Sequence, residues 1–173
     1  MSTAENTAES TAESTATNVT TNIPGSAAGD TAGDTAGDTA VLESVPAVEG
    51  ETFSRVALTP AAVELLGTLR GIHGRLMFHQ SGGCCDGSAP MCYPAGDFLT
   101  GPADVLLGVF TLPGDPATAE LEFWMSREQF EYWKHTLLTV DVVEGRGSGF
   151  SVEAPEGKRF LIRSAIMQDP AGS

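Results

Sequence analysis

Three cysteines within nine residues are the feature of this sequence with the clearest chemical potential. Cys84, Cys85 and Cys92 lie in the segment QSGGCCDGSAPMC, and the 173 residues contain no other cysteine. Thiolates are soft ligands for zinc, Cu(I) and iron–sulfur units, and the nearby glycines allow backbone amides to approach the sulfur atoms. Asp86 and His79 lie close enough along the chain to supply a further ligand. The segment therefore predicts a metal or iron–sulfur site built from these five residues.

The spacing of the cysteines leaves the identity of the centre open. It is not the paired CxxC…CxxC pattern typical of zinc sites, so a zinc, iron or copper ion and an iron–sulfur cluster all remain candidates. Free cysteines are also among the most buried side chains, so the three could be structural. A third alternative is thiol chemistry. Cys84 or Cys85 could form a disulfide, with each other or with Cys92, or attack an aldehyde, disulfide or persulfide as a thiolate.

Other catalytic signatures are weak. The segment GRGSG at 145–149 lacks both the GxGxxG and the GxxxxGK[ST] pattern and precedes a predicted strand, so we interpret it as a turn. No Ser/His/Asp triad signature is recognisable. We therefore expect the chemistry in the cysteine-rich loop at 81–94.

Helix and strand signals flank this loop on both sides. Thr59 is an N-cap followed by Pro60 at the first helical position, and leucines continue at helical spacing. A second, short helix is expected after Ser126, where Gln129 completes a capping box. Alternating apolar residues predict strands at 75–80, 104–112, 120–125, 138–143, 150–153 and 159–166. This order predicts a small α+β domain with a mixed sheet and two short helices.

Charge is distributed unevenly along the chain. The formal net charge is −14, and residues 1–52 hold nine acidic residues and no Lys or Arg. This segment repeats TAES-like and AGDT units and has few large apolar residues, so it cannot bury enough surface to offset its ordering entropy. We therefore expect a disordered acidic tail at 1–52, a single domain at 53–168 and a flexible C-terminus at 169–173.

The composition also excludes several classes of function. A pI near 4.3 without a basic cluster argues against binding nucleic acid or an anionic membrane surface. The sequence contains no run of 18 apolar residues, so no transmembrane helix is expected. The N-terminus has neither the basic nor the apolar region of a secretory signal peptide. These observations together favour a cytoplasmic protein that contacts neither nucleic acid nor membrane.

From Arg55 to Ser164 the chain resembles a small bacterial family of unknown function, the domain of unknown function numbered 779. The resemblance is carried by SGGCCDGSAPMCYP at 81–94, FWMSREQFEYWKHT at 123–136 and LTVDVVEGRGSGFSVEAPEGKRFLIR at 138–163. Members of that family are typically encoded beside NAD-dependent aldehyde dehydrogenases. The resemblance therefore implies an accessory role near aldehyde oxidation, with an aldehyde dehydrogenase as the expected partner.

A more distant resemblance is to the HesB/IscA-like A-type iron–sulfur carriers. The matching segments are LTPAAVELL, MFHQSGGCC and VDVVEGRGSGF, in the same order as in the carriers. This implies a HesB/IscA-like fold, with Cys84 as the loop ligand and a homodimer. The carriers also use a C-terminal Cys-Gly-Cys, whereas this chain ends MQDPAGS. Cys85 and Cys92 could replace the lost pair, the metal could differ, or the fold could have been reused without a cluster.

We therefore expect a nonenzymatic accessory protein that binds a metal or iron–sulfur centre through Cys84, Cys85 and Cys92. His79 and Asp86 are the candidate additional ligands. The alternatives are an enzyme that uses the thiol of Cys84 or Cys85, and an interaction module whose cysteines are structural.

Overall fold

The computed structural model describes residues 40–81, 89–146 and 149–168. The chain forms two units, Met1–Thr35 and Ala36–Ser173, and every described residue belongs to the second unit. Cys84, Cys85 and Asp86, most of the predicted tail and the predicted flexible C-terminus lie outside the described residues. The fold is therefore that of the second unit alone.

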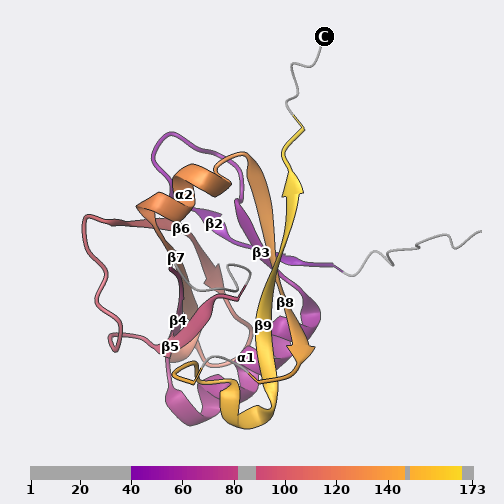
Figure 1. Ribbon diagram of the computed structural model, residues 1–173. Coiled ribbons are helices and arrows are strands. Elements are labelled where there is room, and N and C mark those ends of the chain that lie inside the picture. Colours follow the sequence, from indigo (N-terminus) through magenta and orange to yellow (C-terminus); the bar gives the residue numbers. More distant parts are fainter. Residues whose placement is uncertain (1–39, 82–88, 147–148, 169–173) are drawn as a thin grey trace, which may run out of the picture. The chain divides into compact units, whose positions relative to one another are not determined.

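Within the described part, nine strands form two sheets (Figure 1). The first sheet has the order β1 (Leu42–Glu43), β3 (Val56–Leu58), β8 (Thr136–Glu144), β9 (Lys158–Ile166). The second has the order β2 (Val45–Pro46), β6 (Asp104–Thr111), β7 (Glu120–Ser126), β4 (Leu76–Gln80), β5 (Met91–Pro94). The pairs β3/β8 and β4/β7 are parallel and the other pairs are antiparallel. These mixed sheets confirm the predicted α+β class.

Two α-helices begin where their capping residues predict. α1 (Pro60–His73) starts after Thr59, whose hydroxyl accepts a hydrogen bond from the Ala62 amide at 3.2 Å. α2 (Arg127–Trp133) starts after Ser126, whose hydroxyl accepts from the Gln129 amide at 3.3 Å. A side-chain oxygen at the N-cap satisfies an amide that has no partner within its helix, which is why these local signals suffice. Two 3₁₀ turns, Pro116–Thr118 and Ala154–Glu156, complete the helical elements of the described residues.

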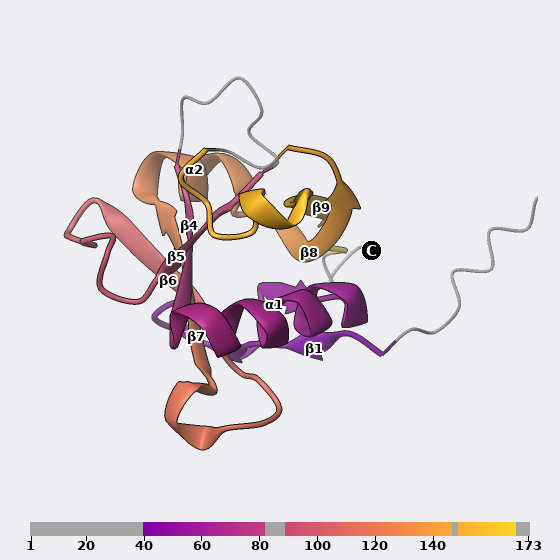
Figure 2. The ribbon, with the colours of Figure 1, turned by 90° about the horizontal axis from the view of Figure 1, so that it is seen from below.

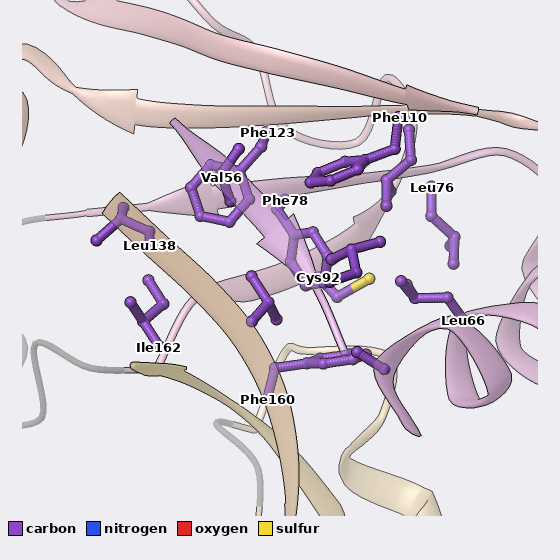
Figure 3. Packing of buried hydrophobic residues seen from close by; sticks show 14 of the residues in the cluster. Val56, Leu66, Leu76, Phe78, Cys92, Phe110, Phe123, Leu138, Phe160 and Ile162 are labelled. Carbon is purple, nitrogen blue, oxygen red and sulfur yellow. The ribbon is translucent and has the colours of Figure 1, made fainter. Parts of the chain in front are cut away.

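One hydrophobic core joins both sheets and α1. Phe78 of β4 packs against Phe123 of β7 and edge-on against Phe160 of β9, with ring centroids 5.6 and 4.9 Å apart. Figure 3 shows side chains of both sheets converging with Leu66 of α1. α1 lies across the end of the two sheets that is lowest in Figure 1, as the view from below shows (Figure 2). The apolar face of α1 therefore closes the core that the sheets enclose.

The ordered domain begins before residue 53. Residues 42–46, which we expected in the tail, form β1 and β2, and these strands pair with β3 and β6. The chain passes from one sheet to the other at Ser44, whose hydroxyl lies 3.0 Å from that of Ser54. Strands of two residues carry too little alternation to be recognised, so their partners in the fold define them.

Two further expectations about the strands need correction. Residues 91–94, which we placed in the cysteine loop, form β5 because they pair with residues 76–79 of β4. Residues 150–153, which we expected as a strand, form turns that lead into the 3₁₀ turn Ala154–Glu156. Val152 nevertheless donates a backbone hydrogen bond to the carbonyl of Cys92 at 3.0 Å, which fastens this segment to β5.

Gly108 provides a test of the revised domain boundary. A Cβ atom at this position would lie 2.6 Å from Ser44 Cβ and 3.0 Å from the Val45 carbonyl oxygen, so Gly108→Ala must displace β2. We expect the free energy of unfolding to fall by about 1–3 kcal/mol. Denaturant unfolding measures the change. The control is Gly67→Ala in α1, where nothing lies within 4 Å of the new Cβ atom and stability should rise by up to about 1 kcal/mol. An unchanged stability of Gly108→Ala would contradict the packing of residues 44–46 on β6.

Candidate functional site

His79 is the predicted site residue that the structure places in a defined polar arrangement. It lies in β4 with only 3% of its surface exposed. Its Nε2 atom is 2.8 Å from Oδ1 of Asp104, at the start of β6, and its Nδ1 atom is 2.9 Å from Oγ of Ser81. The carboxylate fixes the orientation of the ring and its remaining nitrogen faces a hydroxyl. A buried imidazole is thus held between an acid and the first residue of the cysteine loop.

The surroundings of the Asp104 carboxyl group favour its ionised form. The hydrogen bond to His79 is the largest cause that lowers the pKa of this carboxyl group, and burial partly opposes it. The Gly101 amide donates to the other carboxylate oxygen at 2.9 Å, which lowers the pKa further. A hydrogen bond or a positive charge beside a carboxylate favours its charged form. The pair therefore presents His79 with a negative partner.

Aromatic rings cover the outer face of His79. The ring centroid of Phe98 lies 4.1 Å from that of His79, and Tyr93 stacks on Phe98 with centroids 5.2 Å apart. Tyr93 belongs to β5, whereas Phe98 lies in the connection to β6. The imidazole is therefore shielded from water on this side, which strengthens its hydrogen bond to Asp104.

Cys92 lies on the opposite face of the same sheet. It pairs with Phe78 across β4 and β5, is fully buried, and belongs to the hydrophobic core (Figure 3). Successive residues of a strand point to opposite faces, so His79, which follows Phe78, points away from the core. The structure therefore does not bring Cys92 and His79 together. Burial is the main cause that raises the pKa of the Cys92 thiol well above its usual value, and the charge of Glu153 adds to it.

The other predicted ligands cannot be placed. Cys84, Cys85 and Asp86 lie outside the described residues. Among the residues that the structure describes, no group of three or more His, Cys, Asp or Glu side chains is arranged to hold a metal ion. The pair of His79 and Asp104 is thus the described part of the candidate site.

Residues 65–166 match the family described as Domain of unknown function (DUF779), which spans more than half of the chain. The chain belongs to the DUF779 family. Among curated proteins and among solved structures, no match is found. No helix within the described residues of this DUF779 protein is both long and apolar enough to span a membrane.

Two residues that matter for the site of this DUF779 protein were not recognised in the sequence. Asp104 lies 25 residues after His79, and only the pairing of β4 and β6 with β7 brings the two together. Glu153 is 2% exposed and lies within a segment that we expected to be a strand. An acid at the start of an apolar strand was the one available signal for Asp104. No signal in the sequence distinguished Glu153.

Glu153 and Ser151 fasten the turn at 150–156 onto β5. The Ser151 hydroxyl accepts a hydrogen bond from the Cys92 amide at 2.8 Å and donates to the Glu153 carboxylate. Burial raises the pKa of Glu153, although hydrogen bonds from Ser151 and from the backbone amides of Glu153 and Phe160 partly offset this. This contact lies beside the backbone of Cys92, so it determines how β5 is held.

The raised pKa of Glu153 predicts a specific dependence of stability on pH. Its unfolded-state pKa is near the usual 4.5, so the folded state binds more protons above this pH. The contribution of Glu153 to the free energy of unfolding should therefore decrease as pH rises from 4.5 through the folded-state pKa. Denaturant unfolding of the wild type and of Glu153→Gln across this range should show the wild type losing stability relative to the variant. The exposed Glu156, changed to Gln, is the matched control. If the wild type instead becomes more stable relative to Glu153→Gln as pH rises, this assignment is refuted.

Proposed function

We propose that this DUF779 protein is a nonenzymatic accessory protein that binds a metal ion or an iron–sulfur centre through Cys84 and Cys85, with His79 as a further ligand. The observation that carries the proposal is the contact between His79 and Asp104 at the start of the cysteine loop. Histidines that bind metals commonly donate their second ring nitrogen to a carboxylate, which fixes the tautomer and increases the basicity of the ligating nitrogen.

The geometry around His79 fits such a ligand. Asp104 occupies Nε2, which leaves Nδ1 for a metal. Nδ1 faces the Ser81 hydroxyl, and Ser81 is exposed, so its hydroxyl can move away when a metal binds. Cys84 and Cys85 follow Ser81 by three and four residues along the chain. Asp86 remains a candidate for the fourth position.

Cys92 does not fit the ligand set. A metal ligand must be a thiolate, and the apolar surroundings of Cys92 favour the neutral thiol. Its sulfur also lies on the core face of the sheet, opposite His79. We therefore restrict the proposed thiolate ligands to Cys84 and Cys85, and we interpret Cys92 as a structural core residue.

The identity of the centre and of the partner rests on resemblance. The helix, the strand and the Gly-Gly-Cys segment follow one another as in HesB/IscA-like carriers, which supports an iron–sulfur centre, and the thiolates also suit zinc, iron or copper ions. Association of this family with aldehyde dehydrogenases supports such an enzyme, or a related alcohol-oxidation enzyme, as the partner. We propose further that the protein is a homodimer and is located in the cytoplasm.

Metal analysis and visible absorbance of the full chain, purified without oxygen, test the proposal. We expect a bound centre that is lost in the variant with both Cys84→Ser and Cys85→Ser. Asp104→Asn should weaken metal affinity by about 10- to 100-fold, because the ligating histidine loses its carboxylate. Cys92→Ala is the matched control and should retain the metal. If neither purification nor reconstitution yields bound metal, the proposal fails, and a folded Cys92→Ala protein without metal would return Cys92 to the ligand set.

Thiol chemistry is the second candidate function, and the chain of contacts from Asp104 through His79 to Ser81 favours it. An imidazole oriented by a carboxylate can accept a proton from a nearby nucleophile. In this scheme the thiol of Cys84 or Cys85 gives its proton to His79. The thiolate sulfur then forms a bond to an aldehyde carbon, and the carbonyl oxygen takes up a proton to give a hemithioacetal. The same thiolate could attack a disulfide or a persulfide. One S–S bond then forms as the original S–S bond breaks, and the displaced sulfur leaves as a thiolate or as hydrosulfide.

The rate of alkylation by iodoacetamide as a function of pH tests the second candidate. We expect a reactive thiol with a pKa below about 8.5 in a Cys92→Ala background. Its pKa should rise when His79→Gln or Asp104→Asn removes the base or its partner. His73→Gln, at the exposed end of α1, is the control and should leave the rate profile unchanged. Thiols that react only above this pH in every variant would exclude the second candidate.

A further inference from the structure

A cavity of about 890 Å³ is lined by residues outside the segment 81–94. It is bounded by the segment from β1 to the connection between β2 and β3, by the start of β8 and by the residues after β9. Figure 1 shows this connection and the paired ends of β8 and β9 at the same end of the sheets. The cavity is within the range of pockets that hold small ligands, about 300–1,000 Å³. The lining residues include Glu43, Pro46, Phe53, His135, Leu137 and Met167.

Arg55 holds both walls of the cavity in place. Its side chain is 7% exposed and forms two hydrogen bonds to Glu51 in the connection, each of 2.5 Å. Its Nη1 atom donates to the Lys134 carbonyl, next to β8, at 2.6 Å. The guanidinium carbon also lies over the rings of Phe53 and Phe130, 5.3 and 5.2 Å from their centroids. These contacts of a buried arginine tie the connection between β2 and β3 to the residues that precede β8.

The walls offer apolar side chains that the protein itself leaves uncovered. Phe53 and Leu137 are 41% and 40% exposed, and both line the cavity. Pro46 and Met167 add further apolar surface. The Met167 amide donates to the His135 carbonyl at 2.9 Å, which joins the ends of β8 and β9 into one wall. A bound molecule with an apolar body would therefore remove these side chains from water.

The polar side chains of the lining favour a cation. Within the described residues, the side chains of Glu43 and His135 form no hydrogen bond or ion pair, so both remain available to a ligand. The lining residues include the carboxylate of Glu43 and no Lys or Arg. An amine in the cavity would gain a charge-assisted hydrogen bond to the carboxylate of Glu43. A carboxylate ligand would face repulsion from Glu43.

We propose that this cavity binds small amphipathic amines, molecules with one aromatic or alkyl body and one protonated amino group. The apolar body would pack on Phe53 and Leu137, and the amino group would contact Glu43. The cavity shares no residue with the pair of His79 and Asp104. This site is therefore independent of the proposed metal centre, and either can fail without the other.

Titration of the full chain, observed by amide NMR, tests the site with three matched probes: 2-phenylethylamine, 2-phenylethanol and 3-phenylpropanoate. We expect saturable shifts at Glu43, Leu137 and Met167, with the amine bound most tightly and the carboxylate most weakly. Glu43→Gln should weaken binding of the amine about tenfold, because it removes the charge from that hydrogen bond. Binding of the alcohol should stay within about twofold, since the neutral ligand does not depend on that charge.

A variant that fills the cavity completes the test. Thr52 lines the cavity, so Thr52→Trp should abolish binding of the amine and of the alcohol. Ile72→Trp on α1, where the side chain is 64% exposed, is the control and should bind both as the wild type does. Thermal unfolding confirms that both variants fold. Binding that survives Thr52→Trp, equal affinity for the amine and the carboxylate, or no saturable binding at all would each overturn the proposal. If Thr52→Trp fails to fold, Leu137→Trp takes its place with the same expected loss.

Discussion

Burial of β4 on both of its faces is the constraint on which the rest of this structure depends. Every residue from Leu76 to Gln80 is at most 4% exposed, because β7 and β5 flank the strand and other elements cover each face. Phe78 fills the core side, whereas His79 lies under Phe98 on the other side. A polar group removed from water in this way must find a hydrogen-bond partner. Asp104 meets that demand, and the same contact creates the only oriented imidazole seen in the described residues.

The alternation of β4 and β5 also decides what the cysteines can do. Proximity along the chain suggested that Cys92, Cys84 and Cys85 act together. Cys92 pairs with Phe78, however, and its side chain therefore lies on the core face of the sheet. His79, the next residue after Phe78, lies on the opposite face. A thiol surrounded by apolar side chains is stabilised as the neutral form. The proposed ligating or reactive thiols are therefore those of Cys84 and Cys85.

The predictable parts of the fold are those that local chemistry determines. Thr59 with Pro60, and Ser126 with Gln129, mark helix starts because a cap needs only residues within one turn. Long alternating strands such as β7 and β8 were recognised for the same reason. The short strands β1, β2, β3 and β5 were not, since each is defined by its partners. The contact of His79 with Asp104 depends on three strands at once, so no local pattern carries it.

Buried polar side chains in this domain hold two connecting segments against their neighbours. Arg55 is the clearest case, because its desolvation is compensated by Glu51, by the Lys134 carbonyl and by two aromatic rings. Removing any one partner would leave part of a buried charge uncompensated. Displacing the connection before β3 would therefore cost free energy. Glu153 does the same for the turn beside β5 through Ser151. In both places a polar side chain fastens the backbone of a connecting segment, to which Val48 and Val152 add contacts with the core. Arg55 thus joins the connection before β3 to the residues before β8, and Ser151 with Glu153 joins the turn at 150–156 to β5.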